Sequence, residues 1–159
     1  MTSSFEDFAA EHVTPLLRYA TVLTCDPHLA QDVVQECLLR AQQRWGRIGV
    51  LDAPGAYVKR MVTNEFLSWR RRLRPAGSIE GLDPAGEDPT ARYDERDALL
   101  RLIARLPRKQ RAAIVLRYYE GCDDAEIAAY LGCSQGTVRS HISRALATLR
   151  AQDRVKEAL

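Results

Sequence analysis

The sequence of 159 residues has no run of apolar residues that could cross a membrane. A membrane-spanning helix needs roughly 18 or more consecutive apolar residues, and no stretch of the chain reaches that length. The first residues, MTSSFED, are acidic and lack the apolar centre of a secretory signal peptide. We therefore expect a protein that does not insert into a membrane and that stays in the cytoplasm.

The sequence also lacks the groupings of residues that an enzyme or a metal site requires. Its histidines, His12, His28 and His141, are far apart, and there is no glycine-rich phosphate loop. The four cysteines show neither a CxxC motif nor a Cys/His metal spacing. We therefore expect no catalysis, no cofactor and no metal. Most of the cysteines fit small buried thiols, and a redox pair of Cys122 and Cys133 is the alternative.

The net charge of +2 is too small to indicate nucleic-acid binding by itself, but the charge is unevenly distributed. Residues 1–74 hold ten Lys/Arg and eight Asp/Glu, and residues 93–159 hold twelve and nine. Residues 75–92 hold one and four, and they are rich in proline and glycine. Two weakly basic blocks thus flank an acidic stretch with the composition of a linker.

Hydrophobic periodicity predicts helices in nearly every segment outside this linker. Asp26 and Pro27 are typical of a helix start, with Asp26 as the cap and Pro27 at the first position. That helix places Cys37 and Trp45 on its apolar side, and Gly46 to Gly55 is expected to be a loop. The expected helices are about 4–24, 27–45, 54–72, 93–105 and 107–119.

We found no internal repeat and no convincing strand. The predicted fold class is therefore all-α: two small helical domains, residues 1–74 and 93–159, joined by a flexible linker of residues 75–92. Each domain is small enough that its core alone should give only marginal stability.

The last third of the chain predicts a helix, a tight turn and a second helix. Asp123 can cap the first helix, Gly132 can end it, and Ser134 can cap the second. This is the arrangement of a DNA-binding helix-turn-helix. On the second helix, one apolar stripe recurs at spacings of three and four, formed by Val138, Ile142, Ala145, Leu146 and Leu149.

The opposite face of this second helix carries small residues with arginines at its edges. Small side chains let a helix backbone approach another surface, and arginines can reach phosphates or guanine edges. A plain solvated helix is the alternative, although such a helix more often carries long Lys and Glu side chains. The face is formed by Gly136, Ser140, Ser143 and Ala147, flanked by Thr137, Arg139 and Arg144.

Two blocks of the sequence resemble bacterial sigma-70 factors. The stretches LPRKQR (106–111), LRYYEG (116–121), EIA (126–128) and GTVRS (136–140) resemble region 4. AQDVVQE (30–36) resembles region 2.2, and YVKRMVTN (57–64) with WRRR (69–72) resembles region 2.4. Their order and spacing resemble the extracytoplasmic-function (ECF) group, which keeps only regions 2 and 4. The high content of Arg and Ala resembles actinobacterial members of the group.

The resemblance implies an alternative sigma factor that binds core RNA polymerase, recognises the −35 and −10 promoter elements and starts transcription of a specific set of genes. Region 2.2 would dock on the clamp helices of the β′ subunit, and an edge of the segment 114–119 would meet the β flap. An anti-sigma factor is a further implied partner. The resemblance also implies that both domains bind promoter DNA.

The resemblance also implies roles for individual residues. The core-binding residues would be Asp32, Gln35, Glu36 and Leu39. The −10 element would be contacted by Arg60, Asn64, Arg70, Arg71 and Arg72. The −35 element would be contacted by Gln135, Thr137, Arg139, Ser140, Ser143 and Arg144 on the second helix, and by Arg108, Lys109 and Arg111 through backbone phosphates. Arg139 and Arg144 are the leading candidates, and His141 is a further one.

Each of these roles has a plainer alternative. The acids near residue 32 could belong to an ordinary solvated helix face. The arginines at 70–72 could be a basic helix end that complements the helix dipole. Trp69 could either lie in the core or stack on a base. The loop from Trp45 to Ala56 matches the place where the family captures a −10 base flipped from the non-template strand. The chain departs from the usual pattern at Tyr57 and Lys59, next to this loop, and at Cys122 and Asp124, ahead of Glu126 in the first motif helix. As a whole, a stand-alone dimeric regulator is the rival function.

Overall fold

The computed structural model describes residues 4–73 and 95–158, with side chains for residues 4–68 and 98–152. These residues form helices and no strand, which confirms the all-α prediction. The predicted linker 75–92 lies outside the described residues. The chain divides into two compact units, Met1–Phe66 and Leu67–Leu159, and each is described by itself.

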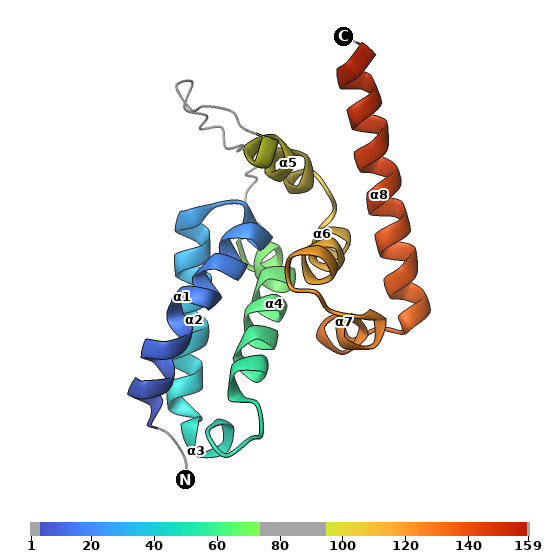
Figure 1. Cartoon of the computed structure of the whole chain (residues 1–159). Coiled ribbons are helices and arrows are strands. Elements are labelled where there is room, and N and C mark those ends of the chain that lie inside the picture. The colour runs from blue at the N-terminus through green and yellow to red at the C-terminus, as the bar shows by residue number, and fades with distance from the viewer. Residues whose placement is uncertain (1–3, 74–94, 159) are drawn as a thin grey trace. The chain divides into compact units, whose positions relative to one another are not determined.

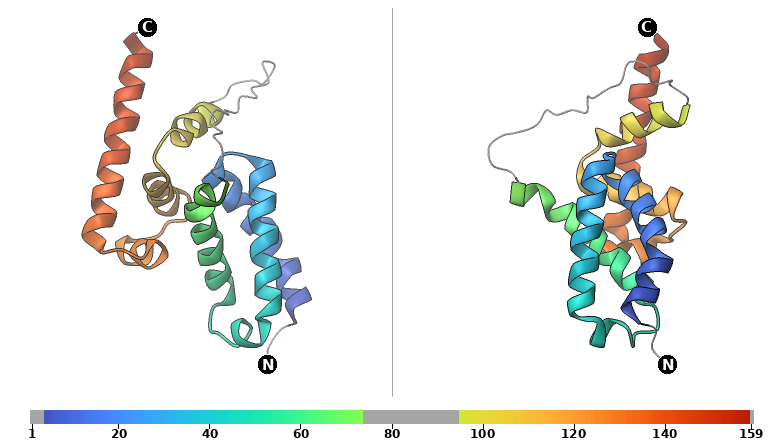
Figure 2. Two further views of the ribbon diagram at one scale, coloured as in Figure 1. Left: turned by 180° about the vertical axis from the view of Figure 1, so that it is seen from behind. Right: turned by 90° about the vertical axis from the view of Figure 1, so that its left-hand side faces the viewer.

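The first unit is built on two antiparallel helices that lie side by side (Figures 1 and 2). They are α1 (Phe5–Thr24) and α2 (Pro27–Gln43), followed by α3 (Trp45–Ile48) and the beginning of α4 (Pro54–Leu73). The hydroxyl groups of Tyr19 on α1 and Thr63 on α4 form a buried hydrogen bond of 2.7 Å. Around it lies the apolar core: Phe8, Leu16, Leu23, Val33, Val34, Cys37, Val58, Val62 and Phe66.

The start of α2 confirms the predicted cap. The Asp26 carboxylate accepts hydrogen bonds from the backbone N–H groups of His28 and Leu29, and Pro27 occupies the first turn. The loop predicted from Gly46 to Gly55 is wrong in its first part, because Trp45–Ile48 forms the short helix α3. The Trp45 ring packs against Phe5 and Phe8 at centroid distances of 5.5 and 4.9 Å, and this burial favours a helical turn that sequence periodicity does not indicate.

Cys25 ends α1 in a left-handed conformation, with φ 60° and ψ 26°. An L side chain in this region costs about 1–2 kcal/mol, while glycine adopts it freely but loses about 0.5–1 kcal/mol of chain entropy on folding. We therefore expect Cys25→Gly to raise the free energy of unfolding by about 0.5–1 kcal/mol. Urea unfolding measures this free energy. Cys133→Gly is the matched control, since Cys133 has no positive φ, and this variant should be less stable than the parent. Equal losses of stability in both variants would contradict the prediction.

The second unit contains α5 (Glu95–Ala104), α6 (Arg108–Ile114), a π-helical segment η2 (Val115–Tyr119), α7 (Asp124–Leu131) and α8 (Gln135–Ala158). Both α6 and α7 pack against α8 (Figure 1). The core of this unit is formed by Ile103, Leu106, Ala112, Ala113, Ile114, Val115, Leu116, Ile127, Val138, Ile142 and Ala145.

The structure confirms a helical segment close to the predicted range 107–119, but its last part, Val115–Tyr119, is π-helical and not α-helical. The Glu120 N–H donates to the Val115 carbonyl over 3.1 Å, five residues back, so the last turn is π-helical. The wider turn keeps Val115 and Leu116 buried and leaves Tyr118 and Tyr119 exposed. A π turn changes the phase of the helix by one residue, which a 3.6-residue period cannot indicate.

Candidate DNA-binding face and docking groove

The predicted helix-turn-helix is formed by α7, the turn at Gly132 and α8. Asp123 and Glu126 make a reciprocal capping box at the start of α7, with both hydrogen bonds at 2.8 Å. Gly132 ends α7 in the left-handed region, with φ 67°. The Ser134 hydroxyl then accepts from the Thr137 N–H over 3.1 Å and caps α8. All three predicted caps are confirmed, and they set where α7 begins and ends and where α8 begins.

The two faces of α8 also agree with the sequence prediction. Val138, Ile142 and Ala145 are buried against the rest of the unit, and Leu146 and Leu149 are half-buried. The opposite face is exposed to solvent throughout and bears no long apolar side chain. Its exposed residues are Gln135, Gly136, Thr137, Arg139, Ser140, Ser143, Arg144 and Ala147. This is a narrow, polar ridge of the kind that can enter a DNA groove.

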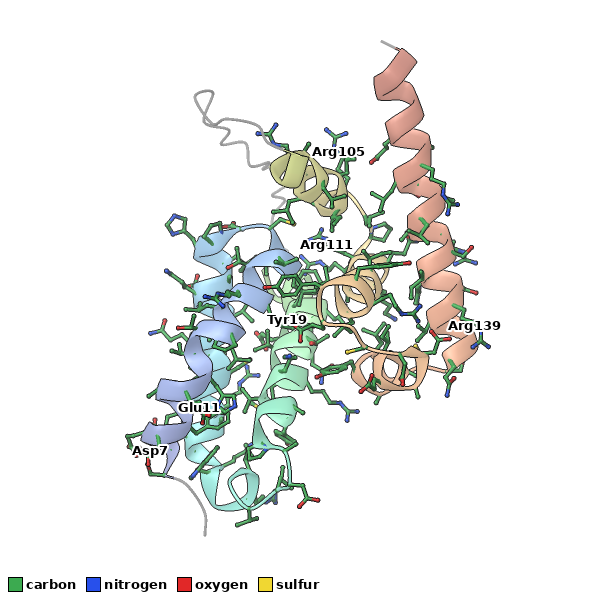
Figure 3. All side chains as sticks on the ribbon, in the orientation of Figure 1. Asp7, Glu11, Tyr19, Arg105, Arg111 and Arg139 are labelled. Carbon is green, nitrogen blue, oxygen red and sulfur yellow. The ribbon has the colours of Figure 1, made fainter. Side chains whose placement is uncertain are left out.

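Arg139 belongs to a network of charges that the sequence prediction missed. Its Nη1 donates to Asp124 Oδ2 over 3.1 Å, and the other oxygen of Asp124 accepts from Arg117 Nη2. Arg117 Nε in turn donates to the Cys122 carbonyl over 3.2 Å. Figure 3 shows Arg139 near the beginning of α8. No sequence signal indicated this pair, because Asp124 and Arg139 are 15 residues apart and meet only when the two motif helices pack together.

The three basic residues that open α6 differ in their surroundings. Lys109 is exposed and Arg108 is half-buried. Arg111 Nη2 donates to the Ala104 carbonyl over 2.8 Å, so part of its guanidinium holds the turn between α5 and α6 (Figure 3). Phosphate contacts by these three residues remain predictions.

His141 lies half-buried on α8, and its Nδ1 is buried. Burial lowers the pKa of His141, and the positive charges of Lys109 and Arg144 lower it further. The folded protein therefore favours the neutral imidazole. Just below the ordinary histidine pKa, His141 binds a proton in the unfolded chain but stays neutral in the folded protein.

Lowering the pH should consequently cost stability through His141. The loss begins near the ordinary histidine pKa of about 6.5 and is complete below the lowered pKa of the folded state. We expect His141→Gln to reduce the difference in unfolding free energy between pH 7.5 and pH 5.5. Urea unfolding at the two pH values measures it. The exposed residue His28 provides the control, and His28→Gln reducing the difference as much as His141→Gln would refute the prediction.

The described −10 candidates lie on one side of α4. Arg60 and Asn64 are both exposed and are one helical turn apart, and the Tyr57 side chain near them is 42% exposed. Lys59 extends its ammonium over the Tyr19 ring, 5.5 Å from the centroid. The side chains of Trp69, Arg70, Arg71 and Arg72 lie outside the described part of the chain. The contacts predicted between these residues and the −10 DNA therefore stay predictions.

The four predicted core-binding residues lie together on α2. Asp32, Gln35 and Leu39 are exposed, and Glu36 is half-buried. They line an open groove of about 490 Å³ together with Phe5, Leu38 and Gln42. Carboxylate and amide groups thus surround an apolar floor, an arrangement that suits a basic, amphipathic helix.

Glu36 is held in place by a neighbour that sequence reasoning missed. Arg40 contacts the Glu36 carboxylate at 3.0 Å and the Glu65 carboxylate at 3.1 Å. Glu65 on α4 is buried. The guanidinium of Arg40 therefore neutralises a buried acid and orients an exposed one, and it ties α2 to α4 beside the groove.

The cysteine predictions have been tested in part. Cys37 is fully buried, as expected, and burial raises the pKa of its thiol to about 12, with the Glu65 carboxylate adding to the effect. It therefore remains a protonated, unreactive thiol. Cys25, Cys122 and Cys133 are only half-buried, so the expectation that most of the cysteines are buried thiols is wrong. A redox role for Cys122 and Cys133 stays a hypothesis. Within the described ranges, no cluster of three metal-binding side chains occurs and no helix is long and apolar enough to span a membrane.

Comparisons with known proteins identify both units. The family model described as Sigma-70 region 2 matches residues 8–75, and the model described as Sigma-70 region 4 matches residues 96–149. The chain is 36% identical over 150 residues to "RNA polymerase sigma-E factor" of Streptomyces avermitilis, covering 93% of this chain and 84% of the relative. It is 38% identical over 147 residues to "ECF RNA polymerase sigma factor SigL" of Mycobacterium tuberculosis, covering 88% and 83%.

A solved structure shares the fold. It is the sigma factor RpoE of Bartonella quintana in complex with the anti-sigma factor NepR, with a TM-score of 0.71 and 23% sequence identity. The match covers 95% of this chain and 97% of the solved one.

Proposed function

The chain belongs to the ECF group of bacterial sigma-70 factors, and from this membership we propose how its two units share the work of promoter recognition. As an alternative sigma factor it acts in transcription initiation with core RNA polymerase and promoter DNA. Members of the family are initiation factors rather than enzymes. The order of the two regions on one chain is the observation that carries the assignment.

We assign docking on core polymerase to the groove on α2. Asp32, Gln35 and Glu36 supply acceptors around Leu39, whose side chain is 52% exposed. An exposed leucine beside two acids and an amide fits the apolar side of a positively charged helix, which the β′ clamp helices would provide. The β flap would contact the exposed tyrosines that end η2, Tyr118 and Tyr119.

The −10 element is assigned to α4. Arg60 and Asn64 share one exposed face, and Arg70, Arg71 and Arg72 continue the same helix. The arginines would hold phosphates, and Asn64 would lie near the bases. Since phosphate contacts carry no sequence information, replacing these arginines should weaken initiation uniformly across promoters and reduce its salt dependence.

The −35 element is assigned to the exposed face of α8. The small residues Gly136, Ser140 and Ser143 let the helix enter the major groove, and Arg139 and Arg144 extend from its edges. Gln135 and Thr137 are at the first turn, where a recognition helix contacts base edges. Arg108, Lys109 and Arg111 would contact the flanking phosphates.

We further propose that the protein acts in the cytoplasm. Its domains would be residues 1–74 and 93–159, with residues 75–92 as the linker. We also propose that an anti-sigma factor covers its docking surfaces. The support for the last point is that the Bartonella protein with this fold was solved with such a partner. A protein that co-purifies with the tagged chain and blocks its assembly with core polymerase would fit. A co-purifying protein that leaves assembly unchanged would not.

Gel shifts separate this function from a stand-alone dimeric regulator. A promoter fragment found by mapping transcript 5′ ends on a genomic library is incubated with the chain, with core polymerase, and with both. We expect a specific shift only when both are present. A specific shift by the chain alone on a two-fold symmetric site would support the rival.

A further inference from the structure

Asp124 occupies the centre of the charge network at the beginning of the helix-turn-helix. Its side chain is 25% exposed, compared with 30% for Arg117 and 64% for Arg139. Each of its oxygens accepts from a different arginine. Arg117 is itself anchored to the backbone at Cys122. The exposed guanidinium of Arg139 is thus connected through Asp124 to Arg117 on η2.

We propose that Asp124 is a positioning residue that sets which base pair of the −35 element Arg139 selects. This inference rests on the proposed role of α8 in −35 recognition. It goes further by assigning a specificity function to an acid that is not among the proposed DNA contacts.

The geometry leaves the guanidinium of Arg139 able to read a base while it is held. An arginine has five N–H donors, and Asp124 accepts from one of them, on Nη1. The Nε and Nη2 groups form a fork of the kind that donates to guanine O6 and N7. The Nη2 atom lies toward the start of α8, since a Cβ added to Gly136 would be 4.0 Å from it. The fork thus lies near Gly136, one of the small residues of the exposed face.

Holding the side chain before DNA binds has a measurable consequence. Ordering a long, flexible arginine at an interface normally reduces affinity by about two- to tenfold, and a side chain that is already ordered avoids that loss. The gain applies only at the base pair for which the held position is correct. Asp124 should therefore increase discrimination between base pairs.

The charge of Asp124 has the opposite effect on non-specific binding. A carboxylate beside the DNA-binding face partly cancels the attraction of Arg117 and Arg139 for phosphates. Removing it should strengthen non-specific binding while weakening discrimination. A substitution that merely damages the fold would weaken both, so the opposite signs distinguish positioning from a structural role.

The test uses holoenzyme assembled from core polymerase and the full chain. A promoter found by mapping transcript 5′ ends is randomised in its −35 element, and the sequences that initiate are compared for the parent, Asp124→Ala, Asp124→Asn and Arg139→Ala. Asp123→Asn is the matched control, because it removes an equal charge one residue away and keeps an oxygen for the Glu126 N–H. Non-specific affinity is measured on a duplex that lacks the promoter.

We expect Arg139→Ala to flatten the preference at one base pair, and Asp124→Ala to flatten it at the same base pair by about two- to tenfold. Asp124→Asn, which keeps the shape of the side chain, should change discrimination in the same direction. Non-specific affinity should rise in both Asp124 variants, while Asp123→Asn should keep the parental preference.

Two results would overturn the inference. If Arg139→Ala flattens one base pair and neither Asp124 variant does, Asp124 positions nothing and the role of α8 stands. If Arg139→Ala leaves every preference unchanged, Arg139 is not a base reader, and the proposed role of this residue fails together with the inference.

Discussion

Arg139→Ala and Arg144→Ala should each lower initiation from promoters that depend on their −35 element by about 1–3 kcal/mol, roughly five- to 150-fold, if each arginine reads a base. Both side chains are exposed on α8, on the opposite side from the buried stripe. Removing either should therefore leave the fold unchanged. Run-off transcription over a range of holoenzyme concentrations measures the effect.

The chain offers a matched control for both arginines. Arg150 is also exposed on α8, but it is outside the helix-turn-helix segment 123–144. Arg150→Ala should have little effect. Losses that are the same on every duplex, with a smaller salt dependence, would mean that the two arginines bind phosphates instead of bases. If Arg139→Ala and Arg144→Ala lower initiation no more than Arg150→Ala does, neither arginine contacts the DNA.

Glu36→Lys should sharply impair assembly with core polymerase while the chain remains folded. Reversing a charge in a docking groove replaces an attraction with a repulsion, and close interfacial charge pairs contribute on the order of 1.5–7 kcal/mol of coupling. We expect a loss of affinity of at least about tenfold. In the free protein the new lysine would meet Arg40, one turn away, and like charges at this spacing cost only a few tenths of a kcal/mol.

Affinity for core polymerase is measured by titrating fluorescently labelled chain. Glu11→Lys is the control, because Glu11 is an exposed acid on α1 (Figure 3). Glu11 is not one of the residues that line the groove. It makes the same change of net charge in the same unit. Equal losses in Glu11→Lys and Glu36→Lys would show that net charge, and not the groove, governs assembly. An unfolding midpoint that falls only in Glu36→Lys would attribute its loss to the fold.

Local signals predicted the elements well. Asp26 with Pro27, Asp123, and Ser134 each set a helix start through hydrogen bonds within a few residues. Such contacts depend on neighbours in the sequence, so their residue types are sufficient to locate them. The same is true of the apolar stripe on α8, since its period follows from helix geometry.

The features that were missed depend on contacts between distant residues. The short helix α3 is stabilised by Trp45 packing on α1, and the π turn at Val115–Tyr119 keeps two side chains in the core. Arg40 reaches Glu65 across 25 residues, and Asp124 reaches Arg139 across 15. Periodicity does not encode such pairs. They follow from how the helices pack.

The central claim is that this chain directs core RNA polymerase to its own set of start sites, and mapping transcript 5′ ends tests it most directly. Purified core polymerase is given a genomic library with and without the chain. The account predicts new start sites that appear only with the chain and share two upstream elements at constant spacing. Identical start sites in both reactions, from a chain shown to be folded, would contradict it.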